Sequence, residues 1–372
     1  MRIGVNLLNL SQDKFGGVEQ YLKNLIAHLA KRRDKLKIFL FLTNGHKDVF
    51  PDDHEKIKKV ILKKGLDNPS AVYKAIRQHR VDLWFCPLHR SYLPHVPVPT
   101  VVTIHDVLHT SFPEYVHGGL EANNRYYKKF SPCIQAVLTV SKFSKKGIAE
   151  HLHIPAKKIH AIYPDASDLF HKRRHDERSA TIKAKYNLPD DYAFYPASYN
   201  PHKNHLNLLK ALLILRDRHQ IKIPLVLTGY INPKNKTYRT LVRFLNDHDL
   251  KKQVKILGYI PPKDMPFLYF NAGFLVFPSL FEGFGFPLVE AMNTQTPIIC
   301  SKAGSIPEIV GDAALFFDPQ KPEDIALKMQ QALHPDTRKL LIRKGRARTK
   351  MFSWERNAVQ TLKVFQRVVG TR

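Results

Sequence analysis

The chain alternates between short apolar runs, rich in β-branched and aromatic residues, and helix-length amphipathic stretches, and it does so in two series. In the first, IGVNLL is followed by VEQYLKNLIAHLAKR, and AVLTVS by KFSKKGIAEHLH. In the second, YAFYPAS is followed by LNLLKALLILRDR. Short buried strands that alternate with crossover helices are typical of parallel sheets covered on both faces. The pattern therefore predicts an α/β protein with a doubly wound parallel sheet in each half.

A charged stretch without apolar periodicity, HKRRHDERS at residues 171–179, separates the two series. With 372 residues, the chain exceeds the length that one hydrophobic core usually serves. We therefore predict two domains, residues 1–178 and 179–352. The ligand site is expected in the cleft between them, as is usual for open α/β folds. The last segment, SWERNAVQTLKVFQRVV, predicts an amphipathic helix after the second domain.

Composition excludes several classes of protein. Apolar residues make up 44% and charged residues 24% of the chain, which excludes a largely disordered protein. The cysteines Cys86, Cys133 and Cys300 are widely separated, so neither a disulfide framework nor a zinc site is indicated. Residues 1–10 are interpreted as a first strand rather than a signal peptide, and no stretch reaches transmembrane length. We therefore expect a cytoplasmic location.

The formal net charge of +27 favours polyanions, anionic lipid surfaces or phosphorylated substrates. Lys and Arg are spread along the chain rather than gathered in one tail, and basicity alone carries no sequence readout, so nucleic acid is not the expected partner. The basic stretches 125–129 and 142–146 lie in the first domain, and the tyrosines in the former suit a lipid headgroup region. Peripheral association with the cytoplasmic face of the membrane is the hypothesis that follows.

The strongest local signal is FEGFGFPLVEAM, residues 281–292, which follows the apolar run FLVFPS. The order strand, glycine turn, helix start is typical of phosphate binding. Gly283 and Gly285 let the backbone approach the ligand, and the first helical amides attract negative charge. Glu282 and Glu290 border this turn, and a carboxylate can accept hydrogen bonds from two sugar hydroxyls. The segment predicts a site for a diphosphate and sugar hydroxyls.

Three other positions are candidates because of where they stand in the pattern. Gly16 and Gly17 lie between the first apolar run and the helix that follows, where phosphate or acceptor could bind, or where the chain simply turns. His105 ends the run TVVTI and could hydrogen-bond the transferred sugar, or pack in the core. Lys203 follows YAFYPAS, where an ammonium could stabilise a departing diphosphate, or lie in solvent.

Taken together, these motifs resemble glycosyltransferase family 4, a group of retaining enzymes with the GT-B fold. Its signature is two glutamates separated by seven residues around a Gly-Phe-Gly turn, as in Glu282 to Glu290. The resemblance extends in the family's order to GGVE (16–19), TIHD, TVSKFS, PHKN and PEIVGDAA. The pieces TIHDVLHTSFPEY and YPASYNPHKNH are similar to a branch that includes mannosyltransferases.

The resemblance implies two Rossmann-like domains, the N-terminal one for the acceptor and the C-terminal one for the nucleotide sugar, with helix 353–372 crossing back onto the first. It also implies roles for individual residues. Glu290 would bind the donor ribose, Lys203 would neutralise the diphosphate, and His202 stands where many members have arginine. The implied donor set is Gly16, Gly17, His202, Lys203, Glu282, Gly283, Phe284, Gly285, Phe286 and Glu290; the implied catalytic set is His105, Lys203 and Glu282.

The sequence therefore predicts a retaining hexosyltransferase that needs no metal or other cofactor. By the branch resemblance, mannose would move from GDP-mannose to a glycan or lipid-linked acceptor during synthesis of a cell-surface polysaccharide such as lipopolysaccharide. Three alternatives stay open: a glycoside hydrolase that uses Glu282 and Glu290, a nucleotide-sugar epimerase, and a catalytically inactive basic protein that binds polyanion or anionic membrane. Asp247-His248-Asp249 resembles a metal motif of another class, but it ends a helical pattern and is interpreted as a helix terminus.

Overall fold

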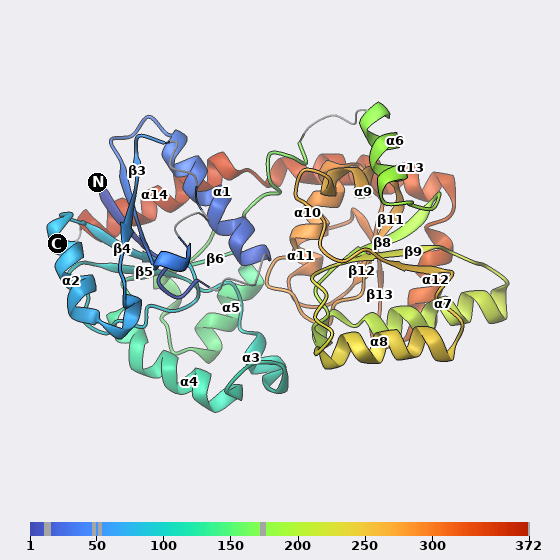
Figure 1. The fold of residues 1–372 in the computed structure, drawn as a ribbon, viewed down its shortest axis with the longest axis horizontal. Coiled ribbons are helices and arrows are strands. Elements are labelled where there is room, and N and C mark those ends of the chain that lie inside the picture. The colour runs from blue at the N-terminus through green and yellow to red at the C-terminus, as the bar shows by residue number, and fades with distance from the viewer. Residues whose placement is uncertain (11–15, 47–49, 51–53, 172–175, 371–372) are drawn as a thin grey trace. The chain divides into compact units, whose positions relative to one another are not determined.

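The computed structural model describes the chain except for residues 11–15, 47–49, 51–53, 172–175 and 371–372. The chain divides into two compact units, Met1–Pro164 with Phe352–Arg372, and Asp165–Met351. Each unit is built on one parallel sheet flanked by helices (Figure 1). The predicted α/β architecture is therefore confirmed in both halves.

The first unit holds a seven-stranded sheet in the order β3-β2-β1-β4-β5-β6-β7. Its strands are short and mostly buried, because both faces of the sheet are covered. They are β1 (Arg2–Asn6), β2 (Lys37–Leu42), β3 (Ile57–Ile61), β4 (Leu83–Cys86), β5 (Thr100–Thr103), β6 (Ala136–Thr139) and β7 (Ile159–Ala161). The helices are α1 (Gly17–Lys31), α2 (Pro69–Gln78), α3 (Leu108–Ser111), α4 (Gly119–Phe130), α5 (Lys142–His151) and α14 (Trp354–Gly370).

The second unit repeats this arrangement with six strands in the order β10-β9-β8-β11-β12-β13. The strands are β8 (Tyr192–Pro196), β9 (Leu225–Thr228), β10 (Val254–Ile256), β11 (Ala272–Phe277), β12 (Ile298–Ser301) and β13 (Ala314–Phe317). The helices are α6 (Asp176–Lys185), α7 (His205–His219), α8 (Lys236–Asp247), α9 (Met265–Asn271), α10 (Phe286–Asn293), α11 (Ile306–Val310), α12 (Pro322–Gln331) and α13 (Pro335–Arg348). Figure 1 shows α7, α8 and α12 on one side of this sheet and α9, α10 and α13 on the other.

The C-terminal helix belongs to the first unit, where α14 packs beside α1 (Figure 1). The ring of Trp354 lies 5.8 Å from that of Tyr21, and the ring of Phe365 lies 5.1 Å from that of Phe85 on β4. Trp354 and Phe365 are both buried. The end of the chain therefore completes the core of the first unit.

The division after Pro164 lies upstream of the boundary that the sequence places at residue 178. Asp165 is buried. Its Oδ2 lies 3.2 Å from Nε2 of His171, and its Oδ1 accepts a hydrogen bond of 3.5 Å from Nδ2 of Asn293. Phe170 packs edge-on against Tyr269, with ring centroids 5.6 Å apart. The chain therefore joins the core of the second unit before the charged stretch, of which residues 172–175 lie outside the described residues.

Candidate functional site

The strand order of the second unit places two predicted segments side by side. β8 and β11 are neighbours in the sheet, although β9 and β10 lie between them in the chain, so the order reverses there and the loops after both strands leave the same edge. The amide of Leu280 donates to the carbonyl of His202 at 2.7 Å, and Asn204 Nδ2 donates to the carbonyl of Pro278 at 3.1 Å. These bonds join the PHKN segment to the loop that carries Glu282.

Lys203 and Glu282, 79 residues apart in the chain, form an ion pair in which Nζ lies 2.6 Å from Oε1. Their side chains are only 17% and 11% exposed, so the pair is shielded from solvent. The hydroxyl of Tyr195 on β8 donates to the carbonyl of Lys203 at 2.7 Å and fixes the main chain there. Burial raises the pKa of Tyr195 well above its ordinary value, so it remains a donor. The structure therefore brings these two predicted residues together.

The main chain of Glu282 is held by the segment after β12. Ser305 donates to the carbonyl of Glu282 from its amide, at 3.1 Å, and from its hydroxyl, at 3.0 Å. Gly304 has a φ of +57°, and a Cβ at this position would lie 2.7 Å from the oxygen and 2.9 Å from the nitrogen of Glu282. Only glycine combines that backbone conformation with so close an approach. Gly304 and Ser305 thereby set the position of Glu282.

The glycine turn leads directly into α10. Gly285 precedes the helix with φ 90° and ψ 67°, and a Cβ there would lie 2.9 Å from Leu288 Cδ1. Phe286 is the first helical residue, and its ring contacts that of Phe284 at 5.2 Å in a T-shaped arrangement. The first amides of a helix have no partner within the helix and carry a partial positive charge. The backbone amides of Phe284, Gly285 and Phe286, which belong to the predicted donor set, therefore lie at a helix N-terminus that suits an anion.

Glu290 lies within α10 and is buried, with 7% of its surface exposed. Its Oε2 accepts a hydrogen bond of 2.6 Å from the hydroxyl of Tyr269 on α9. The aromatic residues of FLYFNAGF, residues 267–274, have the spacing typical of a core, and this pattern gives no indication of the contact. The available signal was the residue type, because a buried tyrosine hydroxyl usually needs a partner.

His105 lies in the first unit, just beyond the carboxyl end of β5. Its Nε2 lies 3.2 Å from the carbonyl of Pro87, and its ring stands edge-on to that of Tyr21 at 4.9 Å. Burial lowers the pKa of His105 to about 3, so the imidazole is neutral near pH 7. Gly16 and Gly17 also belong to this unit, at the start of α1, and no atom lies within 4 Å of a Cβ built at Gly16. Their assignment to the donor stays a prediction.

Sequence reasoning missed the loop after β4, which leaves the sheet of the first unit where its strand order reverses between β1 and β4. His89 has a φ of +64°, donates from its amide to the carbonyl of Thr103 at 3.1 Å, and has its ring 4.9 Å from that of His105. Burial lowers the pKa of His89 to about 4. Two neutral imidazoles therefore stand together at this edge. The signal in the sequence was the pair His89-Arg90, which stands one residue after the run VDLWFCP.

Arg90 is held over aromatic rings beside these histidines. Its guanidinium lies 4.5 Å from the ring centroid of Tyr126 on α4 and hydrogen-bonds Asn123 Oδ1. The hydroxyl of Tyr126 in turn accepts a 2.9 Å bond from the amide of Ser91. Helix α4 and the β4 loop thus form one hydrogen-bonded unit, with a positive charge beside the two imidazoles.

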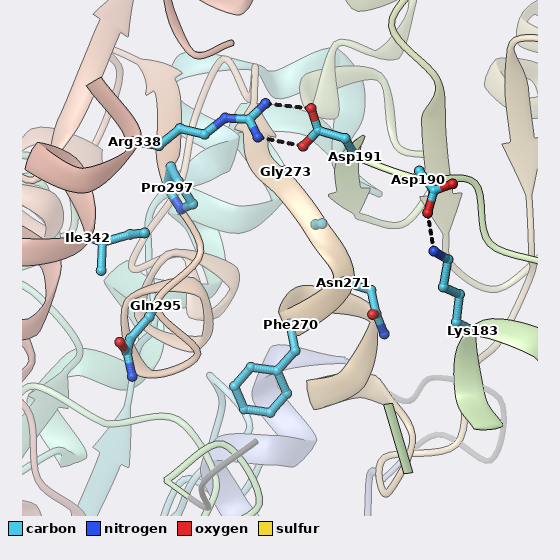
Figure 2. Close-up of a pocket in the computed structure, with 11 residues that line it drawn as sticks. Lys183, Asp190, Asp191, Phe270, Asn271, Gly273, Gln295, Pro297, Arg338 and Ile342 are labelled. Carbon is cyan, nitrogen blue, oxygen red and sulfur yellow. Dashed lines mark hydrogen bonds and ion pairs between the residues drawn. The ribbon is translucent and has the colours of Figure 1, made fainter. Parts of the chain in front are cut away.

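A cavity of about 370 Å³ lies at the opposite end of the second sheet, near the amino ends of β8, β11 and β12 (Figure 2). Arg338 forms a two-bond ion pair with Asp191, and Lys183 pairs with Asp190. A second cavity of about 560 Å³ adjoins it and shares Phe270, Ala272, Gln295 and Ile342 with it. None of the predicted site residues lines either cavity, but Tyr269, whose hydroxyl bonds to Glu290, lines the second.

Among the described residues, no group of three or more His, Cys, Asp and Glu side chains is arranged to hold a metal ion. Asp247 ends α8, His248 caps it, and Asp249 adopts a φ of +50°. This segment is therefore a helix terminus, as the sequence pattern indicates.

Comparison with known proteins gave two family matches: the model described as Glycosyltransferase Family 4 over residues 15–164, and that described as Glycosyl transferases group 1 over residues 178–348. The O-antigen chain mannosyltransferase B of Escherichia coli is 30% identical over 94% of this chain and 96% of its own length. The O-antigen chain mannosyltransferase RfbU of Salmonella typhimurium is 28% identical over 59% of this chain and 56% of its own.

Among solved structures, Anabaena HepE in complex with UDP and glucose is similar with a TM-score of 0.78 and 17% identity, covering 98% of this chain and 99% of that one. At this identity the likeness concerns the fold. It confirms the predicted GT-B class, with its two Rossmann-like parallel sheets.

Proposed function

We propose, since this chain belongs to glycosyltransferase family 4, that it transfers mannose from GDP-mannose to a glycan or lipid-linked acceptor with retention of configuration. The names of two relatives, both O-antigen chain mannosyltransferases, support mannose as the sugar and a cell-surface polysaccharide as the product. The observation that carries the proposal is the shielded Lys203–Glu282 ion pair beside the glycine turn of α10.

The donor diphosphate is assigned to Lys203 and the N-terminus of α10. When the sugar leaves, negative charge grows on the nucleoside diphosphate, and a fixed ammonium together with helical amides stabilises that charge. Lys203 is fixed for this role by Tyr195 on its carbonyl and by Glu282 on its Nζ. His202 belongs to the same loop, and its carbonyl accepts the amide of Leu280.

Glu282 and Glu290 are assigned to hydroxyl groups of the donor, Glu282 to the mannose and Glu290 to the ribose. Carboxylates suit this role because they accept hydrogen bonds from two neighbouring hydroxyls. Both are held in place, Glu282 through its main chain by Ser305 and Glu290 through its side chain by Tyr269. A sugar bound by fixed acceptors loses less rotational freedom at the reaction step.

The acceptor is assigned to the carboxyl edge of β4 and β5 in the first unit. The neutral imidazole of His89 can donate or accept one hydrogen bond with a sugar hydroxyl, whereas that of His105, whose Nε2 donates to the carbonyl of Pro87, can accept one at Nδ1. In the reaction, the bond from the anomeric carbon to the diphosphate breaks and a bond to the acceptor oxygen forms. The acceptor proton passes to the leaving diphosphate, so no protein base and no metal is required.

An anionic membrane surface is the proposed location of a lipid-linked acceptor. Around α4 the side chains of Tyr115, Leu120, Arg125, Lys128 and Lys129 are exposed, and basic and aromatic residues together favour lipid headgroups. No helix in the described part of the chain is both long and apolar enough to cross a bilayer.

Vesicle sedimentation tests this surface. Binding to phosphatidylglycerol vesicles should fall about thirtyfold or more when Lys128 and Lys129 are both changed to Glu, because each basic residue near the surface contributes about 1 kcal/mol. Equal binding to phosphatidylglycerol and phosphatidylcholine vesicles would remove the membrane from the proposal.

A thermal-shift panel tests the donor assignment. GDP, UDP, ADP and their sugar conjugates are compared on the native chain and on Glu290→Ala. A ligand at one hundred times its Kd stabilises the folded state by about 2.7 kcal/mol, which corresponds to a rise in melting temperature of about 5–10 °C. Among these ligands, we expect only GDP and GDP-mannose to raise the melting temperature of the native chain, and neither to raise that of Glu290→Ala. The same rise with GDP in Glu290→Ala would contradict the assignment.

A further inference from the structure

We propose that Tyr269 is a positioning residue for the donor, because it fixes the carboxylate of Glu290 in the orientation that receives the ribose hydroxyls. This inference rests on the proposed function, in which Glu290 is assigned to the ribose. Tyr269 itself need not touch the donor. Its role is to hold the group that does.

The contact that carries the inference is one short hydrogen bond inside the protein. The Tyr269 hydroxyl donates to Glu290 Oε2 at 2.6 Å, and both residues are buried. Burial and the neighbouring carboxylate raise the pKa of Tyr269 well above its ordinary value, so the hydroxyl keeps its proton and remains a donor. A hydroxyl that donates to a carboxylate forms one of the stronger classes of hydrogen bond in proteins.

The ring of Tyr269 cannot turn away from this contact without disturbing its neighbours. It stands edge-on to Phe194 on β8, with ring centroids 4.9 Å apart and an interplanar angle of 90°. It also stands edge-on to Phe170, at 5.6 Å and 82°. Phe194 and Phe170 are both buried. Because buried side chains pack closely, the position of the hydroxyl is set by these two rings.

The main chains of Tyr269 and Glu290 are anchored by the turn that follows α10. Thr296 donates through Oγ1 to the carbonyl of Tyr269 at 2.9 Å, and Thr294 donates through Oγ1 to the carbonyl of Glu290 at 2.9 Å. The two threonine hydroxyls lie 3.0 Å apart and are buried. Glu290 is thus connected to Tyr269 through its side chain and, by way of Thr294 and Thr296, through its backbone.

This arrangement predicts a specific loss when the hydroxyl alone is removed. In Tyr269→Phe the aromatic packing is kept, but Oε2 of Glu290 loses the donor that orients it. Interactions with the ribose diol should weaken, whereas interactions with base and diphosphate should not. We therefore expect the Kd of GDP to rise about tenfold and the Kd of 2′,3′-dideoxy-GDP to stay the same.

The experiment is a calorimetric titration of the full chain with GDP and 2′,3′-dideoxy-GDP. A matched control is Tyr192→Phe, which removes another buried tyrosine hydroxyl, one that donates to the carbonyl of Leu268 on the same helix α9. The control should keep the native preference for GDP over the dideoxy nucleotide. If Tyr269→Phe weakens both nucleotides equally, or keeps the full preference, Tyr269 does not position Glu290.

Two further variants separate this inference from the donor assignment. Glu290→Ala should abolish the preference for the diol; if it does not, the assignment of Glu290 to the ribose fails. If Glu290→Ala abolishes the preference and Tyr269→Phe retains it, only the positioning role is refuted. Thr296→Val removes the bond to the Tyr269 carbonyl with little change in shape and should reduce the preference in part. If Tyr269→Phe folds poorly, Thr296→Val serves as the test instead. An unchanged preference of Thr296→Val for GDP over the dideoxy nucleotide then overturns the inference.

Discussion

The contact between Gly304 and Glu282 gives a sharp test of how the site is built. Gly304→Ala adds a methyl group at a residue whose φ of +57° is unfavourable for any side chain with a Cβ. This methyl group would lie 2.7 Å from the backbone oxygen and 2.9 Å from the backbone nitrogen of Glu282. The left-handed conformation costs about 1–2 kcal/mol for a residue with a Cβ, and forcing extra volume into a packed site costs about 1–3 kcal/mol. The sum is about 2–5 kcal/mol, or about 4–20 °C in melting temperature for a unit of this size.

Because the clash is with backbone, Glu282 must move, and GDP-mannose binding should weaken along with stability. The control is Gly258→Ala, which has a similar φ of +70° but meets only the flexible end of Ile231, Cδ1, at 3.3 Å. Gly258→Ala should lose only the stability that corresponds to the unfavourable backbone conformation, about 1–2 kcal/mol. Melting curves and calorimetric titrations measure both effects. If Gly304→Ala melts like Gly258→Ala and binds GDP-mannose like the native chain, this contact does not hold Glu282.

Three further predictions concern individual contacts. Lys203→Gln should lower turnover about a hundredfold, as loss of one charge-stabilising group does, and an unchanged steady-state rate would remove Lys203 from the catalytic set. Tyr126→Phe leaves the amide of Ser91 without its acceptor and should lower the free energy of unfolding, measured by denaturant titration, by about 1–2 kcal/mol. The KM of the sugar acceptor should also rise. If neither quantity changes, α4 does not support the acceptor site. The bond to Asp165 raises the pKa of His171, so its contribution to stability is present below about pH 6.5 and lost as pH rises through the raised pKa. His171→Gln should therefore be less stable than the native chain at low pH, with a gap in melting temperature that closes on raising the pH, and a gap independent of pH would contradict this pairing.

The sheets could be predicted from the sequence because their signal is local. Runs such as LVLT on β9 and IICS on β12 are short, apolar and bounded by polar stretches, and the structure buries all their residues. The glycine turn before α10 was also visible, since the residue types at Gly285 and Phe286 report the local backbone. Features within one segment of chain were therefore accessible before the fold was known.

Contacts that depend on strand order were not accessible in the same way. Lys203 and Glu282 meet because β8 and β11 are neighbours, and no local pattern gives that order. The spacing of the aromatic residues around Tyr269 indicates burial, which the structure shows, but the bond from Tyr269 to Glu290 depends on how α9 packs against α10. His89 was overlooked because its importance comes from His105, on a different strand end.

The most direct test of the account is transfer of labelled mannose from GDP-mannose to a glycan or lipid-linked acceptor. The account predicts labelled product and an equal amount of GDP, both dependent on the acceptor and both lost in Glu290→Ala, with the anomeric configuration of the donor retained in the product. Free mannose released without acceptor would indicate a hydrolase, and an isomerised donor would indicate an epimerase. Tight, salt-dependent binding of polyanion with no turnover of any nucleotide sugar would contradict the central claim that this protein is a working transferase.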